Sequence, residues 1–113
     1  MSLYARIYRI VAQIPYGKVI NYGSIASVTG CSARQVGYAM ASIPHDLDLP
    51  WYRVVNSKGE ISMRKQGQGD LEQKRLLLEE GVLFDSTGRI DLEHHGWQMS
   101  HDVLDGETLE FGD

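Results

Sequence analysis

The chain has 113 residues, of which 42% are hydrophobic, and a net charge of −4 at pH 7. This size and composition indicate one small globular domain and exclude a disordered or fibrous protein. No apolar run reaches the roughly 20 residues of a membrane span, and the N-terminal stretch lacks the pattern of a secretory signal. We therefore expect a cytoplasmic protein that does not bind membranes. The single cysteine, Cys31, excludes a disulfide framework within the chain.

Charge is distributed unevenly along the sequence. Residues 1–43 contain four Lys and Arg residues and no Asp or Glu, whereas residues 82–113 contain one Arg and eight acidic residues. A surface built from the first segment would be positive and could bind phosphate groups. Nucleic acid is therefore a candidate partner despite the negative net charge, although chance together with an acidic tail would give the same asymmetry.

The first predicted element is an amphipathic helix. Apolar residues at spacings of three and four mark it over residues 3–14. Pro15 and Gly17 follow directly and end it. A short extended link over residues 18–20 leads to the next element.

Two short helices are predicted after this link. Asn21 caps a helix over residues 22–28, and Ser32 caps a second helix over residues 33–42. The turn between them contains Gly30, so the pair is typical of a helix-turn-helix. In that motif the second helix docks in a DNA groove.

The second of these helices has a distinctive outer surface. It presents Arg34, Gln35 and Tyr38 around Gly37. A glycine inside a helix costs about 1 kcal/mol relative to alanine. We therefore expect another helix or a phosphate to approach the backbone closely at Gly37.

The second half of the chain is predicted to mix strands and a helix. Residues 51–55 are expected to be extended, and after a turn residues 60–62 return as the second strand of a β-hairpin. Asp70 caps a helix over residues 71–80, with Gly81 as its stop. The expected buried side of this helix consists of Leu71, Leu76, Leu77 and Leu78.

The predicted fold is α/β and mostly α. It is a winged-helix-like helix-turn-helix DNA-binding domain with a short β-hairpin. We assign residues 1–92 to this domain and residues 93–113 to an acidic C-terminal tail, which docks through Trp97 or is partly disordered.

Few residues suggest catalysis, and no cofactor is predicted. Cys31 precedes a helix N-terminus, which can lower a thiol pKa, but no His or acid lies near it in sequence to activate it. His94 and His95 are adjacent and would point apart, so no metal site is predicted. The pair Trp51 and Tyr52 could instead form a wall on which an extruded base stacks, although a Trp in a small domain is more often core.

The stretch PWYRVV, residues 50–55, resembles the active-site motif of the O6-alkylguanine-DNA alkyltransferases. That motif is Pro-Cys-His-Arg-Val-Val, and its cysteine accepts the alkyl group from a flipped guanine. Here Trp51 stands at the cysteine position and Tyr52 at the histidine position. A Trp in place of the cysteine is the mark of the alkyltransferase-like proteins, which resemble the alkyltransferase C-terminal domain, bind the same base and do not repair it. The resemblance covers residues 3–82.

The resemblance implies roles for residues in both halves of the chain. Tyr22 would press on the phosphate of the target nucleotide, and Arg34 would enter the minor groove and fill the space left by the flipped base. Gly37 matches the small residue where the recognition helix nears DNA. Arg64 would lie over the flipped base. Glu80 matches the glutamate that ends the activating relay, with nothing here to activate.

Two sets of site residues follow from the patterns and the resemblance together. The expected DNA-binding residues are Tyr22, Ser32, Arg34, Gln35, Gly37 and Tyr38. The expected pocket for the flipped base consists of Trp51, Tyr52, Arg53 and Arg64. The sequence departs from the family pattern at Ile43, where the family has a hinge asparagine.

The implied function is damage recognition without catalysis. The protein would bind O6-alkylguanine in double-stranded DNA by base flipping and flag it for nucleotide excision repair proteins, as a cytoplasmic monomer that joins the nucleoid when bound to DNA. One alternative is a sequence-specific transcription regulator that is indifferent to alkylation. The other is an alkyltransferase that uses Cys31, which a covalent adduct on that thiol would reveal.

Overall fold

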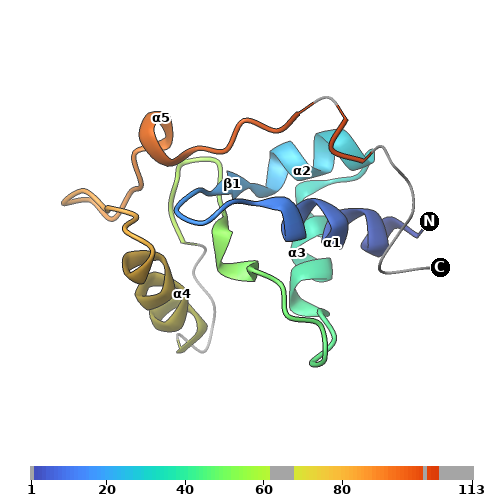
Figure 1. Cartoon of the computed structure of the whole chain (residues 1–113), viewed down its shortest axis with the longest axis horizontal. Coiled ribbons are helices and arrows are strands. Elements are labelled where there is room, and N and C mark those ends of the chain that lie inside the picture. Colours follow the sequence, from blue (N-terminus) through green and yellow to red (C-terminus); the bar gives the residue numbers. More distant parts are fainter. Residues whose placement is uncertain (1, 62–67, 101, 105–113) are drawn as a thin grey trace.

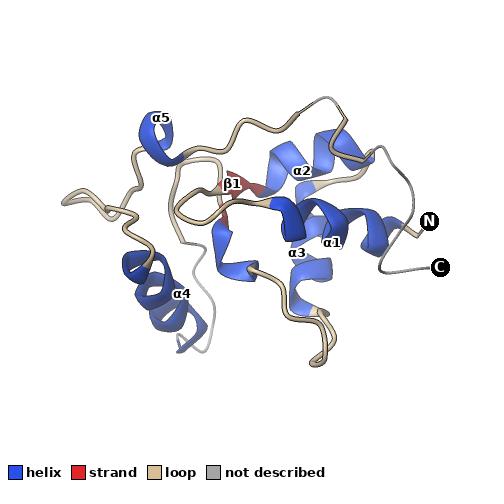
Figure 2. Cartoon of the chain, viewed as in Figure 1, coloured by secondary structure: helices blue, strands red, loops and turns tan. Residues whose placement is uncertain are grey.

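The computed structural model describes residues 2–61, 68–100 and 102–104, with the backbone alone for residues 68–70 (Figure 1). Helices predominate in this part of the chain, and its two strands have two residues each (Figure 2). The prediction of a mostly helical fold is therefore confirmed.

Three helices form the N-terminal half: α1 (Leu3–Gln13), α2 (Tyr22–Thr29) and α3 (Ala33–Ala41). The predicted bounds agree within one residue at each end. The caps are those expected, since the Asn21 side chain accepts a hydrogen bond from the Ser24 amide and Gly30 ends α2 with a φ of 76°. A positive φ of this kind favours glycine, so the residue that ends α2 also sets the tight turn into α3.

Packing between the three helices forms the larger hydrophobic core. The Tyr8 hydroxyl donates a 2.7 Å hydrogen bond to the Ala39 carbonyl and so joins α1 to α3. Val103, near the other end of the chain, is buried in the same core. Its main buried aliphatic residues are Ile7, Ile10, Val11, Ile14, Ile25 and Val36.

The sheet differs from the predicted hairpin. Strand β1 (Ile20–Asn21) pairs in parallel with β2 (Val54–Val55), with Ile20 opposite Val54. Ile61 lies outside any strand, and Ser62 lies outside the described residues. The return strand expected at residues 60–62 was therefore the wrong partner: β2 pairs with a segment more than 30 residues earlier in the chain.

This small sheet separates two cores. Ile20 and Val54 face the helical core, whereas Val19 and Val55 belong to a second cluster with Leu77, which α4 supplies. The division follows from strand geometry, because successive side chains point to opposite faces. The sheet therefore holds the helix-turn-helix and α4 in a fixed relation.

Two local predictions in the second half need correction. Residues 51–53, expected to be extended, form a single 3-10 turn, η1 (Trp51–Arg53), before β2. Helix α4 (Gln68–Glu79) begins before Asp70, which therefore lies inside the first turn rather than at the cap. An acidic residue stabilises a helix either at the N-cap, through a capping hydrogen bond, or in the first turn, through the helix dipole. The sequence alone therefore does not distinguish these two positions for Asp70.

The buried side of α4 also differs from the prediction. Gln73 and Leu77 are almost fully buried, whereas Leu71 is 74% exposed and Leu78 is 49% exposed. Residues four apart share one helix face, and here that face begins at a glutamine. The prediction is therefore confirmed for Leu77 and wrong for Leu71 and Leu78.

The chain beyond α4 returns across the N-terminal half. After α5 (Leu92–His95), Gly96 bridges to Val19, and the Trp97 amide donates to the Val19 carbonyl at 2.8 Å. Figure 1 shows this segment running from α5 back towards α2. The domain boundary at residue 92 stays a prediction. No helix in the described residues is both long and apolar enough to cross a membrane.

Candidate nucleic-acid interface and base pocket

The outer face of α3 carries the polar residues expected to meet DNA. Arg34, Gln35 and Tyr38 are all exposed, Tyr38 by 56%. A Cβ atom placed on Gly37 would meet no heavy atom within 4 Å in the described structure. Packing within the described protein therefore does not explain this glycine.

The N-terminal ends of α2 and α3 suit phosphate groups. Neither helix has an acidic residue in its first turn, so the positive end of each helix dipole is not offset. Ser32 and Gln35 bond each other's backbone amides in a capping box, which fixes the start of α3. Tyr22 is the first residue of α2 and is half-buried against the helical core.

The basic residues of the N-terminal segment do not all gather on this face. Arg6 Nη2 donates to the Thr29 carbonyl at 2.9 Å, and Lys18 Nζ donates to the His94 carbonyl at 2.9 Å. Arg34 is exposed on α3. Of these three cations, Arg34 lies on α3 itself, Arg6 contacts the end of α2, and Lys18 contacts α5.

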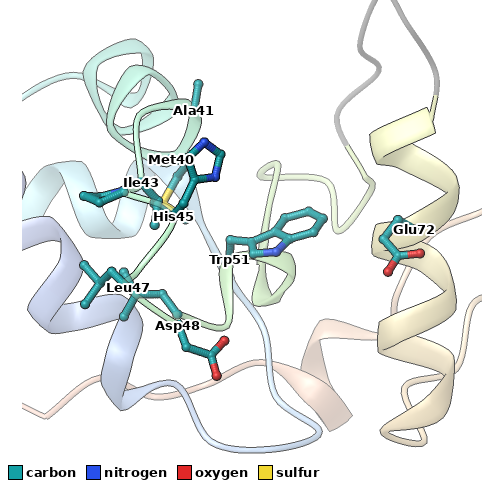
Figure 3. A pocket seen from close by; sticks show the side chains of 10 residues that line it. Met40, Ala41, Ile43, His45, Leu47, Asp48, Trp51 and Glu72 are labelled. Carbon is teal, nitrogen blue, oxygen red and sulfur yellow. The ribbon is translucent and has the colours of Figure 1, made fainter.

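A cavity of about 570 Å³ lies at the other end of α3, within the usual range for ligand pockets. Trp51 stands between the loop that follows α3 and helix α4 (Figure 3). Ala41, the last residue of α3, also lines the cavity, about 10 Å along the helix axis from Arg34. The cavity is lined by Met40, Ala41, Ile43, Pro44, His45, Leu47, Asp48, Leu49, Trp51 and Glu72.

Tyr52 and Arg53, expected in the pocket, are engaged elsewhere. The Tyr52 hydroxyl donates to Glu80 Oε2 at 2.8 Å. The Arg53 guanidinium donates to both Glu80 oxygens through Nε and Nη2, and its Nη1 donates to the Ile14 carbonyl at 2.7 Å. The two charged side chains are only 13% and 6% exposed. Tyr52 still supports the pocket indirectly, because its ring packs edge-on against the Trp51 ring, with the two ring centroids 5.8 Å apart.

Glu80 is the centre of this network. Its Oε1 also accepts a hydrogen bond from the Gly17 amide at 2.9 Å. Burial raises the pKa of the Glu80 carboxyl, but Arg53, Gly17 and Tyr52 together outweigh it and hold the pKa below its usual value. Burial, reinforced by the bond to the Glu80 carboxylate, raises the pKa of the Tyr52 hydroxyl. At neutral pH the network therefore contains a carboxylate and a neutral phenol.

Sequence reasoning missed residues on both sides of the motif. Gln73 Nε2 donates to the Tyr52 and Val54 carbonyls, each at 3.0 Å, and so pins α4 to the PWYRVV segment. Asp48 and Glu72 line the cavity, and no pattern in the sequence singled out either residue. The available sequence signal for Asp48 was its position close before the PWYRVV motif, which begins at Pro50.

Comparison with known proteins places the chain in a family. Residues 2–82 match the family described as 6-O-methylguanine DNA methyltransferase, DNA binding domain. The chain belongs to this family. It is 42% identical over 103 residues to alkyltransferase-like protein 1 of Schizosaccharomyces pombe, covering 86% of this chain and 95% of that protein. It is 43% identical over 94 residues to a DNA base-flipping protein of Escherichia coli, covering 81% of this chain and 71% of that protein.

Solved structures agree with this placement. The structure of S. pombe Atl1 in complex with damaged DNA containing O6-carboxymethylguanine superposes with a TM-score of 0.76, over 86% of this chain and 95% of that one. The Mycobacterium tuberculosis OGT in complex with DNA gives 0.60 at 29% identity, over 71% of this chain and 50% of that one. The fold is that of the 6-O-methylguanine-DNA methyltransferase family.

The remaining sequence predictions concern Arg64, Cys31, Ile43 and a metal site. Arg64, expected over the flipped base, lies outside the described residues. The Cys31 thiol lies in the turn between α2 and α3, 3.2 Å from Thr29 Oγ1, and does not line the Trp51 cavity. Ile43, at the position of the family's hinge asparagine, does line it. Among the described residues, no three His, Cys, Asp or Glu side chains gather as a metal site would require.

Proposed function

We propose that this protein recognises O6-alkylguanine in double-stranded DNA by flipping the base into the Trp51 cavity and holding it there unchanged. The observation that supports this most directly is the position of Trp51. It occupies the family's acceptor-cysteine position in the sequence and lines a cavity at the C-terminal end of the recognition helix. A flipped base would stack on the indole ring, as bases do on aromatic side chains.

Binding without alkyl transfer follows from the chemistry of the residues at this position. An indole ring is not a competent alkyl acceptor, whereas a thiolate is. Tyr52, at the position of the family's base, donates a hydrogen bond to Glu80 and has a raised pKa, so it stays protonated and does not accept a proton near neutral pH. The proposal therefore assigns no catalytic residue.

The helix-turn-helix would supply the grip on DNA. Arg34 would fill the gap that the flipped base leaves in the stack, which offsets part of the few kcal/mol that unstacking costs. Ser32, Gln35 and the start of α3 would contact phosphates beside Tyr22. Arg64 would cover the flipped base from its own loop.

The test is a titration of matched duplexes that differ only in one base, guanine or O6-methylguanine. We expect tighter binding to the alkylated duplex, and an intact-mass spectrum of the protein that does not change after incubation. Equal affinities would favour a transcription regulator that ignores alkylation. A methyl adduct on Cys31 would instead show an alkyltransferase.

We further propose that the bound protein is a monomer, acts in the cytoplasm at the nucleoid, and flags the lesion for nucleotide excision repair. The support is the resemblance to alkyltransferase-like proteins. The test is a reconstituted incision reaction on an O6-methylguanine duplex, with and without this protein. Faster incision of the damaged duplex alone is the expected result, and an unchanged rate would contradict the flagging role.

A further inference from the structure

The Trp51 cavity has an uneven charge. Two carboxylates line it, from Asp48 and Glu72, and no Lys or Arg is among the described residues that line it. His45 is the one other ionisable side chain in this described lining. The described lining is thus acidic, although it lies at the end of a helix that carries Arg34 in its first turn.

The two carboxylates differ in how their charge is balanced. Glu72 Oε2 lies 2.6 Å from Arg75 Nη2 in an ion pair on α4, so its charge is partly neutralised. Asp48 has no ion-pair partner in the described parts of the chain. In Figure 3 its carboxylate extends from the loop on the side that faces α4, below the Trp51 ring. Asp48 is therefore the main source of uncompensated negative charge in the lining.

From this arrangement we propose that the cavity discriminates between O6-adducts by charge, and that Asp48 is the residue that determines the selection. Uncharged adducts bind, and adducts that carry a carboxylate bind less tightly than uncharged adducts of the same shape. The inference rests on the proposed function, because it requires the modified base to enter the cavity beside Trp51.

The physical reason is repulsion between like charges that are close together, here at exposed carboxylates on the cavity wall. Bringing an adduct carboxylate beside Asp48 costs Coulomb energy that a neutral isostere does not cost. The DNA phosphates repel or attract the protein equally in both cases, so they cancel when two adducts in the same duplex are compared. We expect the anionic adduct to bind about threefold to tenfold more weakly than its neutral isostere, as for charges separated by several ångströms near a protein surface.

The experiment uses three duplexes of one sequence, which carry guanine, O6-carbamoylmethylguanine or O6-carboxymethylguanine at one position. The last two differ by one group, a neutral amide against a carboxylate. Dissociation constants are measured with the full chain at pH 8. The quantity of interest is the ratio of the carboxymethyl constant to the carbamoylmethyl constant, at low and at high salt.

Asp48→Asn is the decisive variant, since it removes the charge and keeps the shape. Asp46→Asn is its matched control, because Asp46 is exposed on the same loop, as Asp48 is, but does not line the cavity. The ratio is expected to fall towards one in Asp48→Asn and to stay at the wild-type value in Asp46→Asn. Added salt is expected to narrow the wild-type ratio, because Asp48 is exposed and salt screens exposed charges.

Each other outcome contradicts a defined part of the proposal. A wild-type ratio of one, with both adducts bound more tightly than guanine, would overturn charge selection and leave the proposed function intact. Equal changes of the ratio in Asp48→Asn and Asp46→Asn would overturn the assignment to Asp48. Equal affinity for all three duplexes would overturn the proposed function together with this inference.

Discussion

The outer face of α3 and the network around Glu80 use polar residues in opposite ways. On α3, Arg34 and Tyr38 are exposed and project from a helix that other residues hold in place. Around Glu80, the polar groups of Tyr52 and Arg53 are half-buried and joined to one carboxylate. We propose that the first region contacts DNA, whereas the second holds the segment that carries Trp51 against α4. Substitutions in the first region should therefore change DNA binding and leave the free energy of unfolding unchanged. Substitutions in the second region should lower the free energy of unfolding.

Removing the charge of Glu80 should have the largest effect on stability. Glu80→Gln leaves the half-buried Arg53 guanidinium without its carboxylate, and breaking a buried ion pair costs about 3 kcal/mol of unfolding free energy or more. Urea unfolding measures the change. Glu79→Gln is the control, because the Glu79 side chain is 59% exposed and its ion pair with Arg75 should contribute little. Similar losses for both variants would show that burial of Glu80 is unimportant.

The same ion pair predicts how stability depends on acid. The pKa of Glu80 is lower in the folded protein than its ordinary value of 4.5, so the unfolded chain binds the proton more readily. The contribution of Glu80 is therefore fully present above about pH 4.5 and is lost as the pH falls through the folded-state pKa. Unfolding free energies of wild type and Glu80→Gln should converge as the pH is lowered. A constant difference between them from pH 7 to pH 3 would contradict this.

Replacing Arg34 should break the other region. Arg34→Ala is expected to weaken binding to the alkylated duplex more than tenfold, about 1.4 kcal/mol or more, because the gap left by the flipped base is no longer filled. Unfolding free energy should change by less than about 0.5 kcal/mol, as for other exposed positions. Lys58→Ala, an exposed cation in the turn after β2, is the control for loss of charge alone. An unchanged affinity for Arg34→Ala would reduce Arg34 to a surface charge.

The parts of the structure that sequence predicted are those set by local chemistry. Asn21, Gly30 and Ser32 act on neighbours within four residues, so the bounds of the helix-turn-helix followed directly from them. The pairing of β1 with β2 joins two-residue strands far apart in the chain, and no periodicity can be read from two residues. Such contacts depend on the assembled core rather than on propensity.

The site shows the same division. The resemblance brought Trp51 to attention, and it lines the cavity. It also grouped Arg53 with the base pocket, because adjacent letters in a motif suggest a shared role. The 3-10 turn instead separates them, and Arg53 is bound to Glu80, 27 residues later. Which side of a one-turn helix a residue occupies could not be inferred from the motif.

A smaller loss of stability is expected when the Tyr52 hydroxyl is removed. Tyr52→Phe keeps the ring contact with Trp51 and deletes the 2.8 Å hydrogen bond to Glu80. The expected cost is about 1 kcal/mol in urea unfolding, since Arg53 and Gly17 still satisfy the carboxylate. Tyr16→Phe is the control, because that hydroxyl makes a 3.2 Å bond to the Glu79 carbonyl from an exposed side chain. Equal costs would show that the network does not strengthen the Tyr52 bond.

The smallest expected effect is the gain of alkyl transfer when Trp51 is replaced by the family's acceptor cysteine. In Trp51→Cys the sulfur would have to attack the alkyl carbon as a thiolate, while the bond from that carbon to O6 breaks and guanine takes up a proton. Few thiols are ionised near neutral pH, because the ordinary pKa is about 8.5. Tyr52 cannot remove the thiol proton, since the pKa of its hydroxyl is raised and the hydroxyl stays protonated while it donates a hydrogen bond to Glu80. We therefore expect almost no adduct by intact mass after incubation with an O6-methylguanine duplex.

The double variant Trp51→Cys with Tyr52→His sharpens this result. An imidazole in place of the phenol could accept the thiol proton through one ring nitrogen and donate from the other to the Glu80 carboxylate, which already accepts a bond from this position. Transfer should therefore be faster in the double variant than in Trp51→Cys, while both still bind the alkylated duplex. Rapid transfer by the single variant would mean that the thiol needs no base, and the loss of the cysteine alone would then separate this protein from an alkyltransferase.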